Sequence, residues 1–198
     1  MLSNIQKDTI TEIVNVGVGK GSATLSQMLN DEVVLSIPST ELVDFAKVLV
    51  KLPNITDENV HAVVMRFDGE YSGLASLILP VHSATQLSAH LIHMPADAEE
   101  VIELVDGIMI ELGNILINAI MGSFGNLLPR PFDYQIPTGF EGSLHDLFHH
   151  IDQSRYDKVL LCQTHFSIQD KDIQGDILIM YETDSFEKMK GLFDTLGI

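Results

Sequence analysis

The chain has 198 residues, of which 45% are hydrophobic, so it can bury a sizeable core, and disorder over most of its length is excluded. Eleven basic residues oppose 28 acidic ones, and the formal charge of −17 repels nucleic-acid phosphates and anionic lipid. A single cysteine excludes an internal disulfide. No basic segment followed by an apolar run opens the chain, and no run of about 18 apolar residues occurs. We therefore expect one cytoplasmic domain over residues 1–198, with neither nucleic acid nor a membrane as partner.

Helical spacing of apolar residues in segment 4–29 predicts a first long helix. A second long helix is predicted from Asp97 to about Leu128, because Asp97 and Glu100 have the spacing of an N-terminal capping arrangement. Each long helix leads, through an extended segment, to two strand-like runs and a short helix. The runs and short helices are 61–67, 72–80 and 83–92 in the first half, and 158–168, 175–182 and 185–193 in the second.

The repeated order of elements indicates an internal duplication, which a comparison of the two halves supports. An offset of 99 residues aligns an acid, an amide and a proline, and an offset of 102 aligns a glycine. The aligned pairs are Glu12 and Glu111, Asn15 and Asn114, Pro38 and Pro137, and Gly73 and Gly175. Apolar periodicity alone does not place such residues at matching positions. We predict two α-β-β-α repeats, at about 4–94 and 97–196.

The fold class that follows is α/β, in the broader α+β sense, with pseudo-two-fold symmetry. Both repeats would contribute strands to one mostly antiparallel sheet. The two long helices would lie exposed on it.

A glycine-rich stretch, EIVNVGVGKGSATL at residues 12–25, has the composition of a phosphate-binding loop. Its spacing fits neither known pattern, because Gly21 comes one residue early for a dinucleotide fingerprint, and Lys20 is followed by glycine where a P-loop needs Ser or Thr. The second repeat also lacks glycines at the matching positions. The structural interpretation is that the glycines let one helix face approach a neighbour closely, at a cost of roughly 1 kcal/mol per interior glycine.

The first long helix carries a polar stripe. Asp8, Glu12 and Asn15 stand at i, i+4 and i+7, so at about 100° per residue they fall within roughly 60° of one another. Glu111 and Asn114 repeat the last two members on the second helix. Polar residues on one side of a helix often only face solvent, but the duplication of the same acid and amide favours a functional role.

These residues resemble the signature of the CheC/CheX/FliY family of chemotaxis phosphatases. Asp8, Glu12, Asn15 and Pro38 match it in the first repeat. The second repeat matches with Glu111, Asn114 and Pro137, but Gly107 holds the first position, where the family has Asp or Ser. The neighbouring Asp106 is rotated by about 100° and does not obviously substitute. Two motifs without an added domain most resemble the CheC-type members.

The resemblance implies that the chain hydrolyses the aspartyl phosphate of a CheY-like response regulator. Asn15 and Asn114 would hold the attacking water, and Glu12 and Glu111 would engage the regulator's active-site lysine. No cofactor is implied on this chain, since the regulator would supply its own Mg²⁺. The alternative is a non-catalytic adaptor that binds a response regulator or the deamidase CheD. A small-molecule enzyme would instead need an enclosed polar pocket.

Two further features invite interpretation. A histidine-rich segment contains His145, Asp146, His149 and His150, and histidines at i and i+4 can bind zinc from one helix face. The segment has no counterpart in the first repeat, so a surface helix or loop is the favoured interpretation, with a metal site as the alternative. Cys162 lies in an apolar strand-like run and is expected in the core.

Overall fold

The computed structural model describes residues 3–29, 31–52, 59–128, 132–168 and 171–196. Its α-helices are α1 (Asn4–Leu29), α2 (Val81–Leu91), α3 (Glu99–Gly125), α4 (Leu144–His149) and α5 (Thr183–Leu196). Its strands are β1 (Val33–Asp44), β2 (Asn59–Asp68), β3 (Gly73–Pro80), β4 (Asp133–Tyr134), β5 (Thr138–Ser143), β6 (Lys158–Ile168) and β7 (Lys171–Tyr181). Three short 3-10 turns are η1 (Phe45–Lys47), η2 (Leu49–Lys51) and η3 (Gln153–Arg155).

One sheet contains all seven strands, and each pair in it is antiparallel. The order is β1-β6-β7-β3-β2, and β4 and β5 both pair with the outer edge of β2. The edge strand of each predicted repeat therefore pairs within the other repeat, β1 with β6 and β5 with β2. This confirms the predicted class of helices on a mostly antiparallel sheet.

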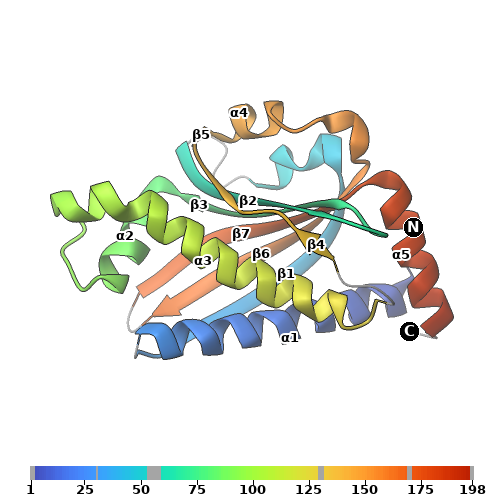
Figure 1. Ribbon diagram of the computed structural model, residues 1–198, viewed down its shortest axis with the longest axis horizontal. Helices are drawn as coiled ribbons and strands as arrows, with labels where there is room; N and C mark the ends of the chain where they lie inside the picture. The colour runs from blue at the N-terminus through green and yellow to red at the C-terminus, as the bar shows by residue number, and fades with distance from the viewer. Residues whose placement is uncertain (1–2, 30, 53–58, 129–131, 169–170, 197–198) are drawn as a thin grey trace.

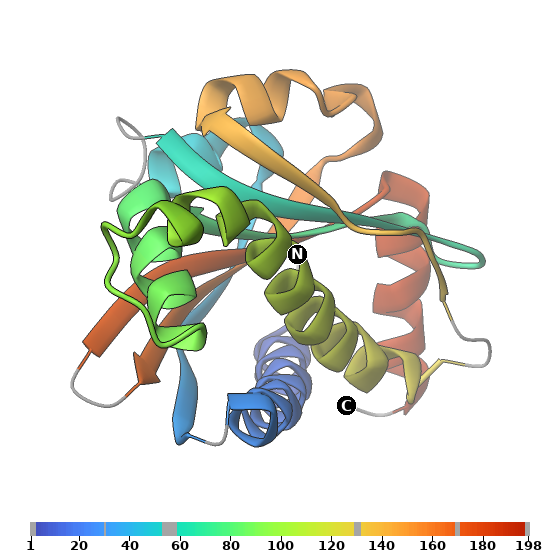
Figure 2. The ribbon, with the colours of Figure 1, turned by 60° about the vertical axis from the view of Figure 1, so that its left-hand side comes forward.

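The sheet separates two layers of helices (Figures 1 and 2). The larger core lies between the sheet and α1, α2, α3 and α5, and it includes Val14, Leu77, Leu116 and Phe193. On the opposite face a smaller core packs beneath α4 and the turns that follow β1, and it includes Phe45, Leu147 and Tyr156. The central strand β3 is buried along its whole length, because both its faces are covered.

The same offsets in residue number relate the elements of the two halves. β1 ends at Asp44 and β5 ends at Ser143, 99 positions later, and a short helical segment follows each strand. At the centre of the sheet Ser76 pairs with Leu178, which lies 102 positions later in the chain. The same offset aligns Gly73 with Gly175, so exchanging the two repeats reproduces the β3–β7 pairing. The order and register are those expected of a pseudo-two-fold arrangement. The duplication as an event in the history of the sequence stays a prediction.

The two long helices begin differently. At α1 the backbone N–H of Gln6 donates to the Ser3 hydroxyl over 3.1 Å, and the Ser3 N–H donates to the Gln6 side-chain oxygen over 2.9 Å. This reciprocal capping box fixes the first turn. The capping predicted for α3 is wrong. Its N-cap is Ala98, which makes no side-chain capping bond, and Glu99 and Glu100 instead place negative charge in the first turn, where the helix dipole favours it.

Two of the three helix glycines lie where α1 crosses α3. A Cβ atom on Gly17 would lie 2.5 Å from the Ile120 Cα, and one on Gly21 would lie 2.8 Å from a methyl group of Leu116. A Cβ atom on Gly19 would meet nothing within 4 Å. Close helix packing, the structural interpretation of the glycine run, is therefore confirmed for Gly17 and Gly21 only.

By length and composition alone, α3 is long and apolar enough to cross a membrane, although the sequence contains no uninterrupted run of about 18 apolar residues. In the fold it packs against α1, α2 and the sheet. Its buried side chains include Val101, Met109, Leu116 and Phe124. The high hydropathy of α3 therefore reflects the apolar side chains that it buries in the larger core.

Cys162 lies on β6 and is fully buried in the larger core, as predicted. Loss of hydration on burial raises the pKa of its thiol to about 12. Because the thiolate is the reactive form, the native protein should not react measurably with a disulfide reagent at pH 8. In denaturant, one equivalent of thiol per chain should react. Rapid labelling of the native protein would contradict this burial.

Candidate functional site

The polar stripe of α1 faces solvent. Asp8, Glu12 and Asn15 are all exposed, while Ile10, Ile13 and Val14 on the same helix are buried in the larger core. Glu12 and Asn15 stand three residues apart, so their side chains neighbour each other on the helix surface. Among the described residues, no hydrogen bond or ion pair holds the side chain of Asn15. An acid and a free amide are thus presented together on a helix anchored to the sheet.

The second pair, on α3, is arranged differently. Glu111 is exposed, but Asn114 is only partly so. The Asn118 side-chain amide donates a hydrogen bond of 2.6 Å to the Asn114 side-chain oxygen. Gly19 stands at the position of α1 that matches Asn118 at the offset of 99 residues, and it has no side chain to make this bond. Asn118 was not among the site residues predicted from the sequence, although the offset that pairs the motifs also pairs it with a glycine.

The first position of the second motif remains without an acid. A Cβ atom on Gly107 would meet nothing within 4 Å, so this position is open. The neighbouring Asp106 is directed toward the sheet, where its Oδ1 lies 3.3 Å from Nδ1 of His61 on β2. Asp106 therefore does not replace the missing acid, as its rotation about the helix axis predicted.

The two matching prolines lie in the segments that follow the long helices. Pro38 is within β1, where the register with β6 shifts between Ser36 and Ser39. Pro137 immediately precedes β5. A proline lacks the N–H that a sheet ladder uses, so a break in register or the start of a strand accommodates it. Both prolines thus lie where the sheet can accommodate them.

The histidine-rich segment forms the short surface helix α4. His145, His149 and His150 are exposed, and the rings of His145 and His149 meet edge to face with centroids 4.6 Å apart. The backbone N–H of Asp146 donates to the Ser143 hydroxyl, which caps the helix. In the described parts of the chain, no group of three metal-ligating side chains includes these histidines. The surface-helix interpretation is confirmed.

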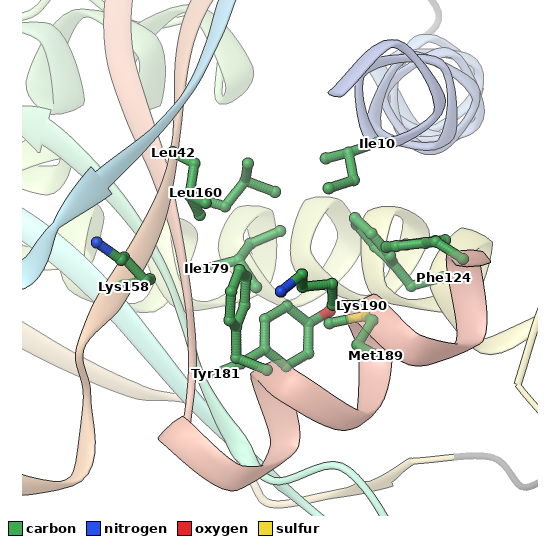
Figure 3. A pocket seen from close by; sticks show the side chains of 11 residues that line it. Ile10, Leu42, Phe124, Lys158, Leu160, Ile179, Tyr181, Met189 and Lys190 are labelled. Atoms are coloured by element: carbon green, nitrogen blue, oxygen red, sulfur yellow. The ribbon is translucent and has the colours of Figure 1, made fainter. Parts of the chain in front are cut away.

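A small apolar pocket opens between α1, α5 and the sheet (Figure 3). None of Glu12, Asn15, Glu111 and Asn114 lines it. Its wall consists of Ile10, Leu42, Phe124, Leu160, Ile179, Tyr181, Phe186, Met189 and Phe193, with Lys158 and Lys190. It is not the enclosed polar pocket that a small-molecule enzyme would need.

The chain is similar in sequence to a known protein. No family model matches the chain. The CheY-P phosphatase CheC of Bacillus subtilis is 26% identical over 204 residues, which covers 97% of this chain and 94% of that protein.

Solved structures show the same fold. FliY of Thermotoga maritima superimposes with a TM-score of 0.76, at 17% identity, over 98% of both chains. A complex of CheX with CheY, BeF₃ and Mg²⁺ from Borrelia burgdorferi matches 87% of this chain and 99% of that one, with a TM-score of 0.57 and 16% identity. The FliM middle domain from H. pylori, 14% identical, covers 96% of this chain and 99% of its own with a TM-score of 0.68. The chain thus has the fold of the CheC/CheX/FliY family and a sequence likeness to CheC over nearly its whole length, which confirms the resemblance drawn from its two helix motifs.

Proposed function

We propose that the chain accelerates hydrolysis of the aspartyl phosphate of a CheY-like response regulator, with Glu12 and Asn15 as its principal site. The observation that carries the proposal is that an acid and a free amide stand one turn apart on the exposed face of α1. The similarity to a CheY-P phosphatase, and to a CheX that was solved with CheY, supports this choice of substrate. Burial of the amides would have excluded it, since a docked regulator meets only surface side chains.

An amide and an acid are sufficient for this reaction. An aspartyl phosphate is a reactive acyl phosphate, and its hydrolysis needs an attacking water in line with the leaving group and stabilisation of the charge that spreads over the phosphoryl oxygens. The Asn15 carbonyl can accept a hydrogen bond from that water while its NH₂ group donates another. Glu12 would pair with the regulator's lysine and fix how deeply α1 enters. The regulator brings the Mg²⁺, so this chain needs no cofactor.

Exposed apolar side chains beside the stripe support docking of a protein at α1. Ile5 is 64% exposed and Val16 is 45% exposed. At about 100° per residue both project to the same side of the helix as Glu12. A partner that covers Glu12 would also remove Ile5 and Val16 from water. Recognition would then rest on local contacts and shape, since the charge of −17 opposes encounter with another acidic protein.

Glu111 and Asn114 form a second, weaker site in this proposal. An amide whose oxygen already accepts a 2.6 Å hydrogen bond from Asn118 must break that bond before it can hold a water with the same oxygen. The missing acid at Gly107 removes a further polar group from the stripe. We therefore expect the two sites to contribute unequally.

The test is phosphate release from purified phosphorylated CheY-like regulators in the presence of Mg²⁺. The wild-type chain should accelerate release from its own regulator, and Asn15→Ala combined with Asn114→Ala should abolish the acceleration. Asn15 is exposed and Asn114 is partly exposed, so circular dichroism and thermal unfolding of the double variant should match the wild type. Acceleration at the wild-type rate by a folded double variant would contradict the proposal.

The second candidate function is a cytoplasmic adaptor without catalysis, for a response regulator or for CheD. The observation that favours it is the likeness to FliM middle domains, one of which was solved in a FliG–FliM complex. Binding and catalysis separate the two functions. An adaptor would bind the phosphorylated regulator or CheD, yet leave the rate of phosphate release unchanged. A phosphatase would raise that rate in proportion to the enzyme added.

A further inference from the structure

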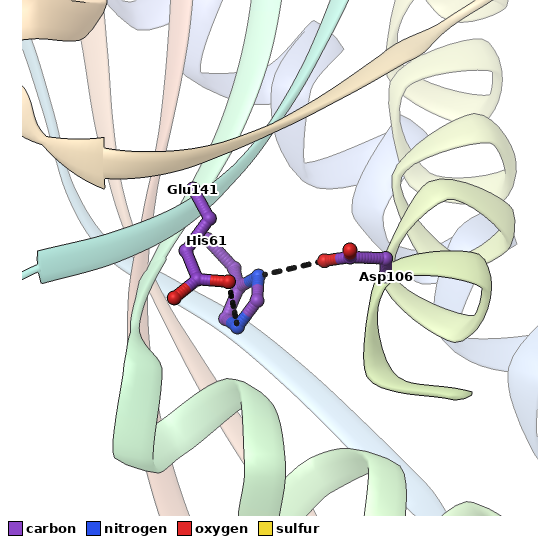
Figure 4. A group of neighbouring side chains, drawn as sticks. All are labelled: His61, Asp106 and Glu141. Carbon is purple, nitrogen blue, oxygen red and sulfur yellow. Dashed lines mark ion pairs between the residues drawn. The ribbon is translucent and has the colours of Figure 1, made fainter. Parts of the chain in front are cut away.

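Three side chains from three separate elements converge where α3 passes over the edge of the sheet (Figure 4). They are His61 on β2, Glu141 on β5 and Asp106 on α3, and one ligand atom from each lies within 4.8 Å of the others. From this geometry we propose that His61, Asp106 and Glu141 form a binding site for a divalent transition-metal ion such as Zn²⁺. The site is separate from the residues proposed for phosphatase activity.

Sheet register brings two of the three ligands together. His61 and Glu141 are directly opposite each other in the antiparallel β2–β5 pair. Opposed residues project to the same face, with Cβ atoms about 5 Å apart. That face is the one that α3 covers, and there Asp106 reaches the imidazole from above. Because the three positions lie far apart in sequence, no local sequence motif predicts the cluster.

His61 is the fixed member of the cluster. Its side chain is 4% exposed, whereas those of Asp106 and Glu141 are 71% and 54% exposed. An imidazole buried where α3 covers β2 cannot easily change its position, while two exposed carboxylates can rotate toward an ion. The arrangement is thus a rigid nitrogen ligand with two adjustable oxygen ligands at the solvent side.

The two contacts of His61 engage different nitrogens of its ring. Nδ1 lies 3.3 Å from Oδ1 of Asp106, and Nε2 lies 3.9 Å from Oε2 of Glu141, which is too long for a hydrogen bond. One ion can bind only one of these nitrogens, because they point to different sides of the ring. One ligand atom from each residue nevertheless lies within 4.8 Å of the others, and two ligands of a tetrahedral zinc ion, each bonded at about 2.0–2.2 Å, lie roughly 3.4 Å apart. Coordination therefore requires that the exposed carboxylate facing the other nitrogen rotate toward the bound ion, with water in the remaining positions.

The chemistry of the three ligands indicates which class of ion the site would bind. Imidazole nitrogen suits Zn²⁺ and similar transition metals, while Mg²⁺ and Ca²⁺ prefer oxygen ligands throughout. The two carboxylates carry two negative charges, which one divalent ion neutralises. Bound there, the ion would join β2, β5 and the first half of α3, the helix that also carries Glu111 and Asn114.

The experiment is calorimetric titration of the full chain with ZnCl₂, after treatment with a chelator and without any regulator. The wild type should bind one ion per chain saturably, and its thermal midpoint should rise when the ion binds. Asp106→Asn and Glu141→Gln, both at exposed positions, should each weaken binding tenfold or more. His61→Gln should abolish it. Cobalt(II) added as a second probe should develop visible absorption bands that are lost in the same variants.

The matched control is the double variant His145→Ala, His149→Ala, which removes the exposed histidine pair of α4. It should bind zinc at the proposed site as tightly as the wild type does. Two results would overturn the proposal. One is the absence of saturable one-to-one binding to the wild type, which would leave His61 as a residue that only pairs with carboxylates. The other is wild-type affinity in the folded Asp106→Asn and Glu141→Gln variants. Neither depends on phosphatase activity.

Discussion

Asn15→Ala should lower the rate of regulator dephosphorylation by about 10- to 100-fold, since a misplaced attacking water costs a factor of this order. Asn114→Ala should change the rate far less. The reason is that Asn15 is exposed and its amide is free, whereas the Asn114 oxygen already accepts a hydrogen bond from Asn118. Initial rates of phosphate release at equal enzyme concentration measure both losses. Equal losses would show that the two sites act alike despite Gly107 and Asn118.

An exchange between the two helices isolates the cause of the difference. Gly19→Asn would give α1 the side chain that restrains the amide on α3, and the open space around Gly19 can hold it. This variant should lose activity, while Gly19→Ala, which adds no amide, should keep it. In the opposite direction, Asn118→Gly should raise the residual activity of the Asn15→Ala protein. If Gly19→Asn and Gly19→Ala had the same activity, the hydrogen bond would not explain the weaker second site.

Gly17→Ala should lower the free energy of unfolding by about 1–3 kcal/mol, the usual cost of overpacking a core. The added methyl carbon would lie 2.5 Å from the Ile120 Cα and 3.0 Å from the Ala119 carbonyl oxygen. Both neighbours are backbone atoms, which cannot rotate aside, so α1 and α3 would have to separate. Urea denaturation measures the change.

Gly19 provides the control for this prediction, two residues away on the same helix. A Cβ atom there meets nothing, so Gly19→Ala should gain about 0.5–1 kcal/mol from the lower entropy of the unfolded chain and the better helix propensity of alanine. The two substitutions are chemically identical and should have opposite signs. A stabilising Gly17→Ala would mean that the helices do not pack as closely as described.

Local patterns predicted most of the elements, because they depend on neighbours in sequence. The bounds of α1 and β6 agree with the predicted segments 4–29 and 158–168. The predictions were wrong at the ends of two elements, where tertiary contacts determine the bounds. β7 begins at Lys171, four residues before the predicted start, as part of a hairpin paired along its length with β6. The N-cap of α3 is Ala98, so Asp97 lies one residue before the capping position that it was expected to occupy.

The repeated acid and amide of the candidate site could be predicted from the sequence. The features that depend on tertiary packing could not. The spacing of Glu12 and Asn15 places them on one helix face, and the structure exposes both. The restraint on Asn114 depends on a side-chain rotamer of Asn118, which no periodicity specifies. The cluster around His61 depends on the β2–β5 register, which brings together residues 80 positions apart. Strand pairing between repeats could not be deduced from either repeat alone.

The most direct test of the proposed chemistry is the structure of this chain in complex with its regulator, held in the Mg²⁺ and BeF₃ form that imitates the phosphorylated state. We predict that α1 covers the regulator's active site. The Asn15 amide should lie within hydrogen-bond distance of a water in line with the beryllium, and the Glu12 carboxylate should pair with the regulator's lysine. A complex in which the regulator sits elsewhere, with Asn15 and Asn114 both left in solvent, would contradict the account.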